Sequence, residues 1–209
     1  MSVALEDAAD WLAGGGLLAY PTETVWGLGA DARSDAAVER LRRFKGRGDD
    51  APISILVDDR DSLPALGFDP SPLACALADR YWPGPLTLVL PCAGGFAKGV
   101  ARDDGAVGVR CSPHPAAAAL AGRLAARGVG PVTATSLNRT GEPAARSRRE
   151  ARALCDDGDD APRLLDVDDD AGQGRESTVL DLCASPPRVL RWGAIEEDDL
   201  NRALAGSPA

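Results

Sequence analysis

The feature that most constrains the fold is the alternation of short apolar runs with longer segments of helical periodicity along the whole chain. Residues 16–21, GLLAYP, form an apolar run of strand length. Residues 34–47, SDAAVERLRRFKGR, follow with apolar side chains at helical spacing, after Ser34 as a residue suited to cap a helix. Such alternation is typical of α/β proteins. The sequence therefore predicts an α/β fold.

A single domain is expected from the length and the hydrophobic content. The chain has 209 residues, of which 44% are hydrophobic, and this suffices for one substantial core. We predict one domain over residues 1–209, with its core at about residues 5–195. Further strands are predicted at 52–57, 85–91, 105–111, 131–136, 163–167, 177–182 and 188–192, and further helices at 4–16, 71–82, 113–128, 147–157 and 194–204.

The charge balance argues against a broad nucleic-acid-binding surface. The formal net charge is −9, whereas contacts to phosphates need clustered cations. The excess of carboxylates is also typical of proteins from a salty cytoplasm, which gives the hypothesis that molar salt stabilises the fold. Residues 155–176 are rich in acidic residues, Gly and Pro, and we expect a solvated loop region there. Their spacing does not match a Ca²⁺-binding loop.

The cysteines and the single histidine exclude several kinds of site. The five cysteines are far apart in the sequence and odd in number, so neither a zinc framework nor a disulfide framework is indicated. We expect them to be small buried hydrophobic residues, and we expect His114 to start a helix or a turn. No apolar run reaches the roughly 18 residues of a membrane span, and the N-terminus lacks the pattern of a signal peptide. We therefore expect a cytoplasmic protein without a membrane partner.

Four polar clusters interrupt the apolar pattern at the ends of predicted elements: PTETVWG, KGR, TSLNRTG and RESTV. Open α/β sheets gather their ligand sites at such places. Lys45 and Arg47 suit a phosphate or carboxylate, although a basic helix end that complements the helix dipole is the alternative. Ser136 and Asn138 could bind a phosphate or a ribose, or could make ordinary turns.

The order and spacing of these motifs resemble one family over nearly the whole chain. YPTETVWGLGADA, Lys45-x-Arg47, YWPGPLTLVLP, TSLNRTGEP and STVLDL are together similar to the YrdC-like threonylcarbamoyl-AMP synthases. The resemblance implies a twisted, open, mixed sheet with a deep central cavity. It also implies that ATP condenses L-threonine with bicarbonate to give threonylcarbamoyl-AMP and pyrophosphate. We expect a short form, without the extra C-terminal domain of longer members.

The resemblance also implies the site residues and partners. The catalytic residues would be Lys45, Arg47, Ser136 and Asn138; the threonine-binding residues Thr24, Arg110, Ala134 and Ser177; and the nucleotide-binding residues Thr22, Arg47, Ser136, Asn138 and Arg191. ATP would be a substrate, and Mg²⁺ would be held mainly by its phosphates, with no metal site on the protein. A downstream threonylcarbamoyl transferase complex would use the product to modify tRNA, which the chain itself would contact indirectly or weakly.

Two positions depart from the family pattern and keep alternatives open. Leu137 stands where the middle residue of Ser-x-Asn is usually Ala, and Leu56 stands where some members have a histidine. A paralogue of the same fold with altered activity is the nearest alternative. A non-catalytic RNA-binding module and a regulator that binds nucleotide without threonine are two others.

Overall fold

The computed structural model describes residues 1–46, 48, 52–155, 160–168, 170–172 and 174–206. Its strands form one mixed sheet in the order β1-β8-β2-β3-β7-β4-β6-β5-β9-β10. The strands are β1 (Ser2–Val3), β2 (Leu18–Tyr20), β3 (Gly27–Gly29), β4 (Ser54–Val57), β5 (Leu86–Pro91), β6 (Ala106–Cys111), β7 (Val132–Ser136), β8 (Arg163–Leu165), β9 (Thr178–Asp181) and β10 (Arg188–Arg191). The helices are α1 (Ala8–Ala13), α2 (Asp35–Lys45), the short η1 (Pro64–Leu66), α3 (Pro72–Tyr81), α4 (Pro115–Arg127), α5 (Arg148–Cys155) and α6 (Glu197–Gly206).

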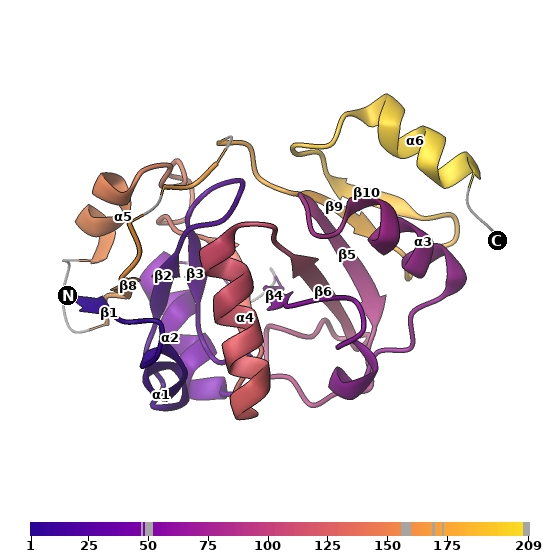
Figure 1. Ribbon diagram of the computed structural model, residues 1–209. Helices are drawn as coiled ribbons and strands as arrows, with labels where there is room; N and C mark the ends of the chain where they lie inside the picture. The colour runs from indigo at the N-terminus through magenta and orange to yellow at the C-terminus, as the bar shows by residue number, and fades with distance from the viewer. Residues whose placement is uncertain (47, 49–51, 156–159, 169, 173, 207–209) are drawn as a thin grey trace.

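The order of pairing makes the sheet mixed. β8 pairs in parallel with β1 and β2, β4 with β6, and β5 with β9, while the other neighbours are antiparallel. In Figure 1, α5 lies beside the β8 end of the sheet, and α3 and α6 lie at the β9–β10 end. This arrangement confirms the predicted single α/β domain.

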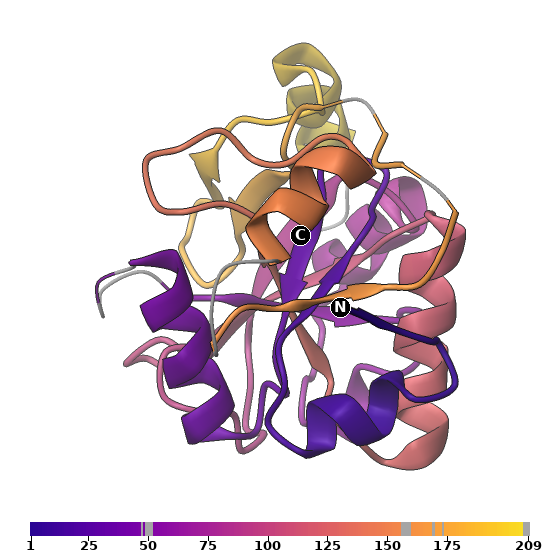
Figure 2. The ribbon, with the colours of Figure 1, turned by 90° about the vertical axis from the view of Figure 1, so that its left-hand side faces the viewer.

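Hydrophobic cores cover both faces of the sheet because side chains alternate along its strands. Along β2 and the residue before it, Leu17 and Ala19 belong to one cluster, whereas Leu18 and Tyr20 belong to the other. The first cluster is covered by α2, α3, α5 and α6, and the second by α1 and α4. Figure 2, viewed from the β1 end of the sheet, shows α2 and α4 on opposite sides.

The helices α2 and α4 begin and end where their capping residues predict. Ser34 caps α2 by accepting a hydrogen bond from the backbone N–H of Ala37, and Gly46 ends α2 in the left-handed conformation with φ 62°. His114 caps α4, because its Nδ1 accepts from the backbone N–H of Ala116 at 3.2 Å. The predicted helix-start role of His114 is thus confirmed.

The structure differs from the sequence predictions in several details. The core is wider than residues 5–195, since Val3, Leu200 and Ala203 are also buried. Within the acidic segment, the strand predicted at 163–167 is present as the shorter β8, and residues 156–159, 169 and 173 lie outside the described part. Of the cysteines, Cys111 and Cys155 are buried as expected, but Cys183 is exposed.

The strand β3 is not predicted by the sequence, because a glycine pair normally indicates a turn. Here the glycines make room for buried side chains. A Cβ on Gly27 would lie 2.8 Å from Cζ of the Tyr20 ring, and one on Gly29 would collide with Val132. The Tyr20 hydroxyl donates to the backbone oxygen of Thr133 at 2.8 Å, which fixes the ring across β3.

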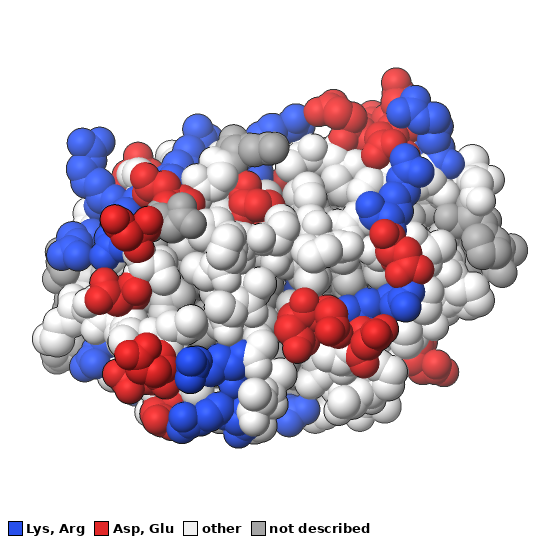
Figure 3. Space-filling model, in the orientation of Figure 1, with Lys and Arg blue, Asp and Glu red and all other residues white. Residues whose placement is uncertain are grey.

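Charged groups of both signs are interspersed on the face drawn in Figure 3. Ion pairs on the surface of the protein include those of Arg80 with Asp199 and of Arg175 with Glu196. No helix in the described ranges is both long enough and apolar enough to cross a membrane.

Candidate active site

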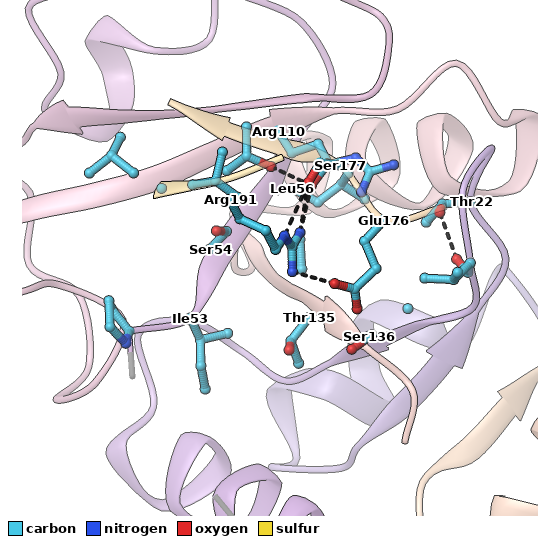
Figure 4. Close-up of a pocket in the computed structure, with 18 of the residues that line it drawn as sticks. Thr22, Ile53, Ser54, Leu56, Arg110, Thr135, Ser136, Glu176, Ser177 and Arg191 are labelled. Carbon is cyan, nitrogen blue, oxygen red and sulfur yellow. Dashed lines mark hydrogen bonds and ion pairs between the residues drawn. The ribbon is translucent and has the colours of Figure 1, made fainter. Parts of the chain in front are cut away.

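A pocket of about 280 Å³ lies against the sheet, lined by residues of β4, β5, β6, β7, β9 and β10 and of the loop after β2. Figure 4 shows side chains from these separate segments converging on it. Six of the residues predicted from the sequence line this pocket: Thr22, Arg110, Ala134, Ser136, Ser177 and Arg191. The fold therefore brings together residues that are more than 160 positions apart along the chain. The depth that the resemblance implies for the cavity stays a prediction.

One end of the pocket is built around Arg110, the next-to-last residue of β6. Its Nη2 donates to Thr24 Oγ1 at 2.7 Å and to Glu23 Oε1 at 2.6 Å. Thr24 Oγ1 in turn lies 2.9 Å from the hydroxyl of Thr22, which donates to the backbone oxygen of Val25. The predicted pair of Thr24 and Arg110 is thus in direct contact, although Thr24 itself is not among the lining residues.

Arg191, the last residue of β10, occupies another part of the pocket. Its Nη2 donates to the backbone oxygen of Ser177 at 2.9 Å and to Ser177 Oγ at 3.2 Å, and its Nη1 pairs with Glu176. Ser177 Oγ also lies 2.9 Å from the hydroxyl of Thr87 on β5. In Figure 4 the guanidinium of Arg191 and the Glu176 carboxylate lie side by side above Thr135 and Ser136.

Lys45 and Asn138 lie next to the pocket but not among its lining residues. Lys45 is buried, and its Nζ donates to Asn138 Oδ1 at 2.7 Å and to the backbone oxygen of Ser136. The same Asn138 Oδ1 accepts from Ser136 Oγ at 2.8 Å. The three predicted residues form one hydrogen-bonded group, in which Lys45 holds the turn that follows β7. Arg47, the fourth predicted catalytic residue, lies outside the described residues.

Apolar residues complete the lining. Trp26 is fully buried, belongs to the main core and also lines the pocket, so its roles as wall and as core residue coincide. Its Nε1 is buried and has no hydrogen-bond partner within the described ranges. Leu56 lines the pocket in the position that departs from the family pattern, whereas Leu137 is fully buried in the core and does not line it.

Sequence reasoning missed Arg102, which also lines the pocket. Its Nη1 donates to Asp181 Oδ2 at 2.7 Å, and its other nitrogens contact Asp104. Burial raises the pKa of Asp181, but hydrogen bonds from Arg102 and the backbone of Cys183 outweigh it and hold the pKa below its usual value. Arg102 precedes β6 in a loop, so no strand-end pattern identifies it.

Glu176 and Glu23 were also missed, because carboxylates are not expected to contact the arginines of an anion-binding site. Glu176 is the one carboxylate among the described residues that line the pocket, against three arginines: Arg102, Arg110 and Arg191. The lining also carries the hydroxyls of Thr22, Ser136 and Ser177. Arginines and hydroxyls in a partly enclosed space bind anionic groups such as carboxylates and phosphates.

The fold is that of a known family of α/β proteins. The Sua5/YciO/YrdC family model, which carries the description "Telomere recombination", matches residues 10–193. The chain belongs to this family.

The similar proteins include threonylcarbamoyl-AMP synthases. The Pyrococcus abyssi enzyme is 35% identical over 200 residues, covering 94% of this chain and 56% of the relative. A putative threonylcarbamoyl-AMP synthase of Mycobacterium tuberculosis is 34% identical over 190 residues, covering 91% of this chain and 84% of the relative. The chain thus spans little more than half of the first relative but most of the second.

Solved structures of related proteins have the same fold. The crystal structure of P. abyssi Sua5 complexed with L-threonine has a TM-score of 0.83 and 32% identity, covering 97% of this chain and 60% of that one. The MTH1692 protein of Methanobacterium thermoautotrophicum has a TM-score of 0.66 and 38% identity, with 92% and 88% covered. Escherichia coli YciO, at 22% identity and a TM-score of 0.78, supports the fold alone.

Proposed function

We propose that this chain is a threonylcarbamoyl-AMP synthase, which condenses L-threonine, bicarbonate and ATP to threonylcarbamoyl-AMP and pyrophosphate. The observation that carries the proposal is that one pocket joins the Arg110–Thr24 pair to the Arg191–Ser177 pair. The first pair suits the carboxylate and hydroxyl of an amino acid, and the guanidinium of Arg191 suits a phosphate. The names of the relatives support this assignment.

The reaction needs charge stabilisation more than a protein nucleophile. The threonine amine attacks the carbon of bicarbonate, and water leaves as the carbamate forms. A carbamate oxygen then attacks the α-phosphorus of ATP, and pyrophosphate leaves. Since both substrates of the second step are anions, fixed cations and hydroxyls can contribute through positioning and electrostatic stabilisation. Arg110 would hold the threonine carboxylate, while Arg191, Ser136 and the Lys45–Asn138 group would face the nucleotide.

A magnesium ion would fit this pocket as a companion of ATP. Mg²⁺ is usually held by substrate phosphates, waters and one or two carboxylates, and Glu176 is the carboxylate in the described lining. The ion would neutralise charge on the phosphates. The proposal extends to a cytoplasmic protein whose product passes to a separate threonylcarbamoyl transferase complex that modifies tRNA, with weak or indirect tRNA contact by this chain.

Pyrophosphate release from ATP tests the proposal. With Mg²⁺ and bicarbonate, release should require L-threonine, and serine should be a poor substitute. Lys45→Ala should lower kcat/KM by about 2–4 kcal/mol in transition-state free energy, the size found for one charge-stabilising donor. Lys98→Ala is the matched control, because Lys98 is exposed and does not line the pocket.

The outcomes separate the alternatives. A folded protein that binds ATP but never releases pyrophosphate in response to threonine would contradict the proposal and favour an altered paralogue or a nucleotide-binding regulator. Salt-sensitive tRNA binding without ATP turnover would favour an RNA-binding module. A fully active Lys45→Ala variant would remove Lys45 from the catalytic group.

A further inference from the structure

We propose that Glu23, held by Ser112, is a positioning residue that fixes the guanidinium of Arg110 for threonine binding. The inference rests on the proposed function and concerns how selectively the pocket recognises its amino acid. It assigns work to two residues that the motifs alone do not single out.

The contacts use both oxygens of the Glu23 carboxylate. Oε1 accepts from Arg110 Nη2 at 2.6 Å, and Oε2 accepts from Ser112 Oγ at 2.5 Å. Ser112 Oγ itself accepts from the backbone N–H of His114, the residue that caps α4. A continuous chain of hydrogen bonds therefore ties Arg110, through Glu23, to the start of a helix.

The strand geometry explains why one carboxylate can reach both partners. Arg110 lies near the end of β6, and Ser112 is the first residue after that strand. Residues two apart in an extended segment point to the same side. Glu23 comes from the loop between β2 and β3. Its carboxylate can therefore contact the side chains of both Arg110 and Ser112.

Burial makes the bridge stiff. Arg110 is 8% exposed and Ser112 2% exposed, and the Glu23 side chain is 19% exposed. An arginine side chain has many rotamers, and fixing it before a ligand arrives removes part of the entropic cost of binding. Glu23 and Thr24 hold one end of the guanidinium at Nη2, while Arg110 Nε is buried without a hydrogen-bond partner among the described residues.

Glu23 acts through Arg110 and not on the ligand. It is absent from the lining of the pocket, whereas Arg110 is part of it. Its two oxygens are also already occupied by hydrogen bonds within the protein. A role as general base for the threonine amine would require Glu23 to leave both partners.

The test compares Glu23→Ala with Glu23→Gln and Ser112→Ala. Glutamine keeps an acceptor for Arg110 and can donate to Ser112 Oγ, so it preserves the geometry without the charge. L-Threonine affinity is measured by calorimetry without ATP, and KM for threonine, KM for ATP and kcat are measured separately. Glu6→Ala is the control, because Glu6 is an exposed glutamate that does not line the pocket.

We expect Glu23→Ala to weaken threonine binding by about 10-fold or more, the effect of losing one hydrogen bond to a charged group. Glu23→Gln should restore the affinity to within about 3-fold of the wild type, a difference below 1 kcal/mol. Ser112→Ala should fall between them, and KM for ATP should stay unchanged in all three variants.

The remaining outcomes distinguish the proposed function from the positioning role of Glu23. A wild-type protein that does not bind threonine overturns the proposed function and this inference with it. Normal threonine affinity in Glu23→Ala, or equal losses in the Ala and Gln variants, overturns the positioning role alone. If Glu23→Ala does not fold, Ser112→Ala decides: weaker threonine binding with an unchanged KM for ATP supports the inference, and unchanged binding overturns it.

Discussion

At the scale of single residues, Leu137 shows how a position inside a motif can serve the core and not the pocket. It lies between Ser136 and Asn138, whose side chains bond to each other next to the pocket. Its own side chain is fully buried in the main core. The extra bulk relative to the usual alanine therefore fills the core and leaves the pocket lining unchanged.

Leu137→Ala should lower the free energy of unfolding by about 2–5 kcal/mol, because it leaves a cavity in a packed core. KM for ATP should stay near the wild-type value. Chemical denaturation and steady-state kinetics measure the two effects. Leu190→Ala is the matched control, since Leu190 lines the pocket and is 44% exposed, so its truncation should cost much less stability. Unchanged stability with an altered KM for ATP would instead place Leu137 at the nucleotide.

Motif residues could be predicted because their types and spacing are local features of the sequence. Thr22, Ser136, Ser177 and Arg191 all lie beside the ends of strands that the apolar pattern indicates. Glu23 could not be assigned in this way, because its role depends on Arg110 and Ser112, nearly 90 positions further along. A carboxylate that positions an arginine can be recognised only when the positions of both side chains in the fold are known.

At the scale of secondary-structure elements, the sequence predicted the long helices and most strands, and it failed at β3 and at the two-residue β1. The periodicity of α2 and α4 and their capping residues identify them directly. β3 consists of Gly27, Leu28 and Gly29, a composition that disfavours a strand. The strand forms because its neighbours β2 and β7 pair with it on both sides, and because Tyr20 needs the space above its glycines.

Gly27→Ala should therefore lower the free energy of unfolding by about 1–3 kcal/mol, the usual cost of overpacking a core. The new Cβ would lie 2.8 Å from the ring of Tyr20, which is fully buried. Gly122→Ala is the control: Gly122 lies within α4 with open space around its Cα, so alanine should stabilise the protein by about 0.5–1 kcal/mol. Urea denaturation of both variants measures the difference, and equal effects would contradict this account of β3.

At the scale of the whole molecule, the excess of acidic residues governs the response to salt. The 32 acidic residues outnumber the 23 lysines and arginines. At low ionic strength, repulsion among the excess negative charges therefore destabilises the folded state. Exposed ion pairs such as that of Arg80 and Asp199 act in the opposite sense, but each contributes little. The balance favours stabilisation by salt.

Raising KCl from about 0.1 M to about 1 M shortens the Debye length from about 10 Å to about 3 Å. The melting temperature should rise, by about 2–4 °C for each 1 kcal/mol of repulsion that is screened. Differential scanning calorimetry at several KCl concentrations measures the rise. A constant or falling melting temperature would show that the ion pairs outweigh the net charge and would end the hypothesis of adaptation to a salty cytoplasm.

The strand order has a consequence for how the protein is made on the ribosome. β2 pairs with β8, and β5 pairs with β9. Both ends of the sheet can therefore be completed only after these late segments of the chain have been translated. Arg110 and Thr24 leave the exit tunnel well before Arg191. A nascent chain can therefore assemble the half of the pocket that suits an amino acid before the half that suits a nucleotide exists. Translation that stops short of β10 would leave the first half without the second.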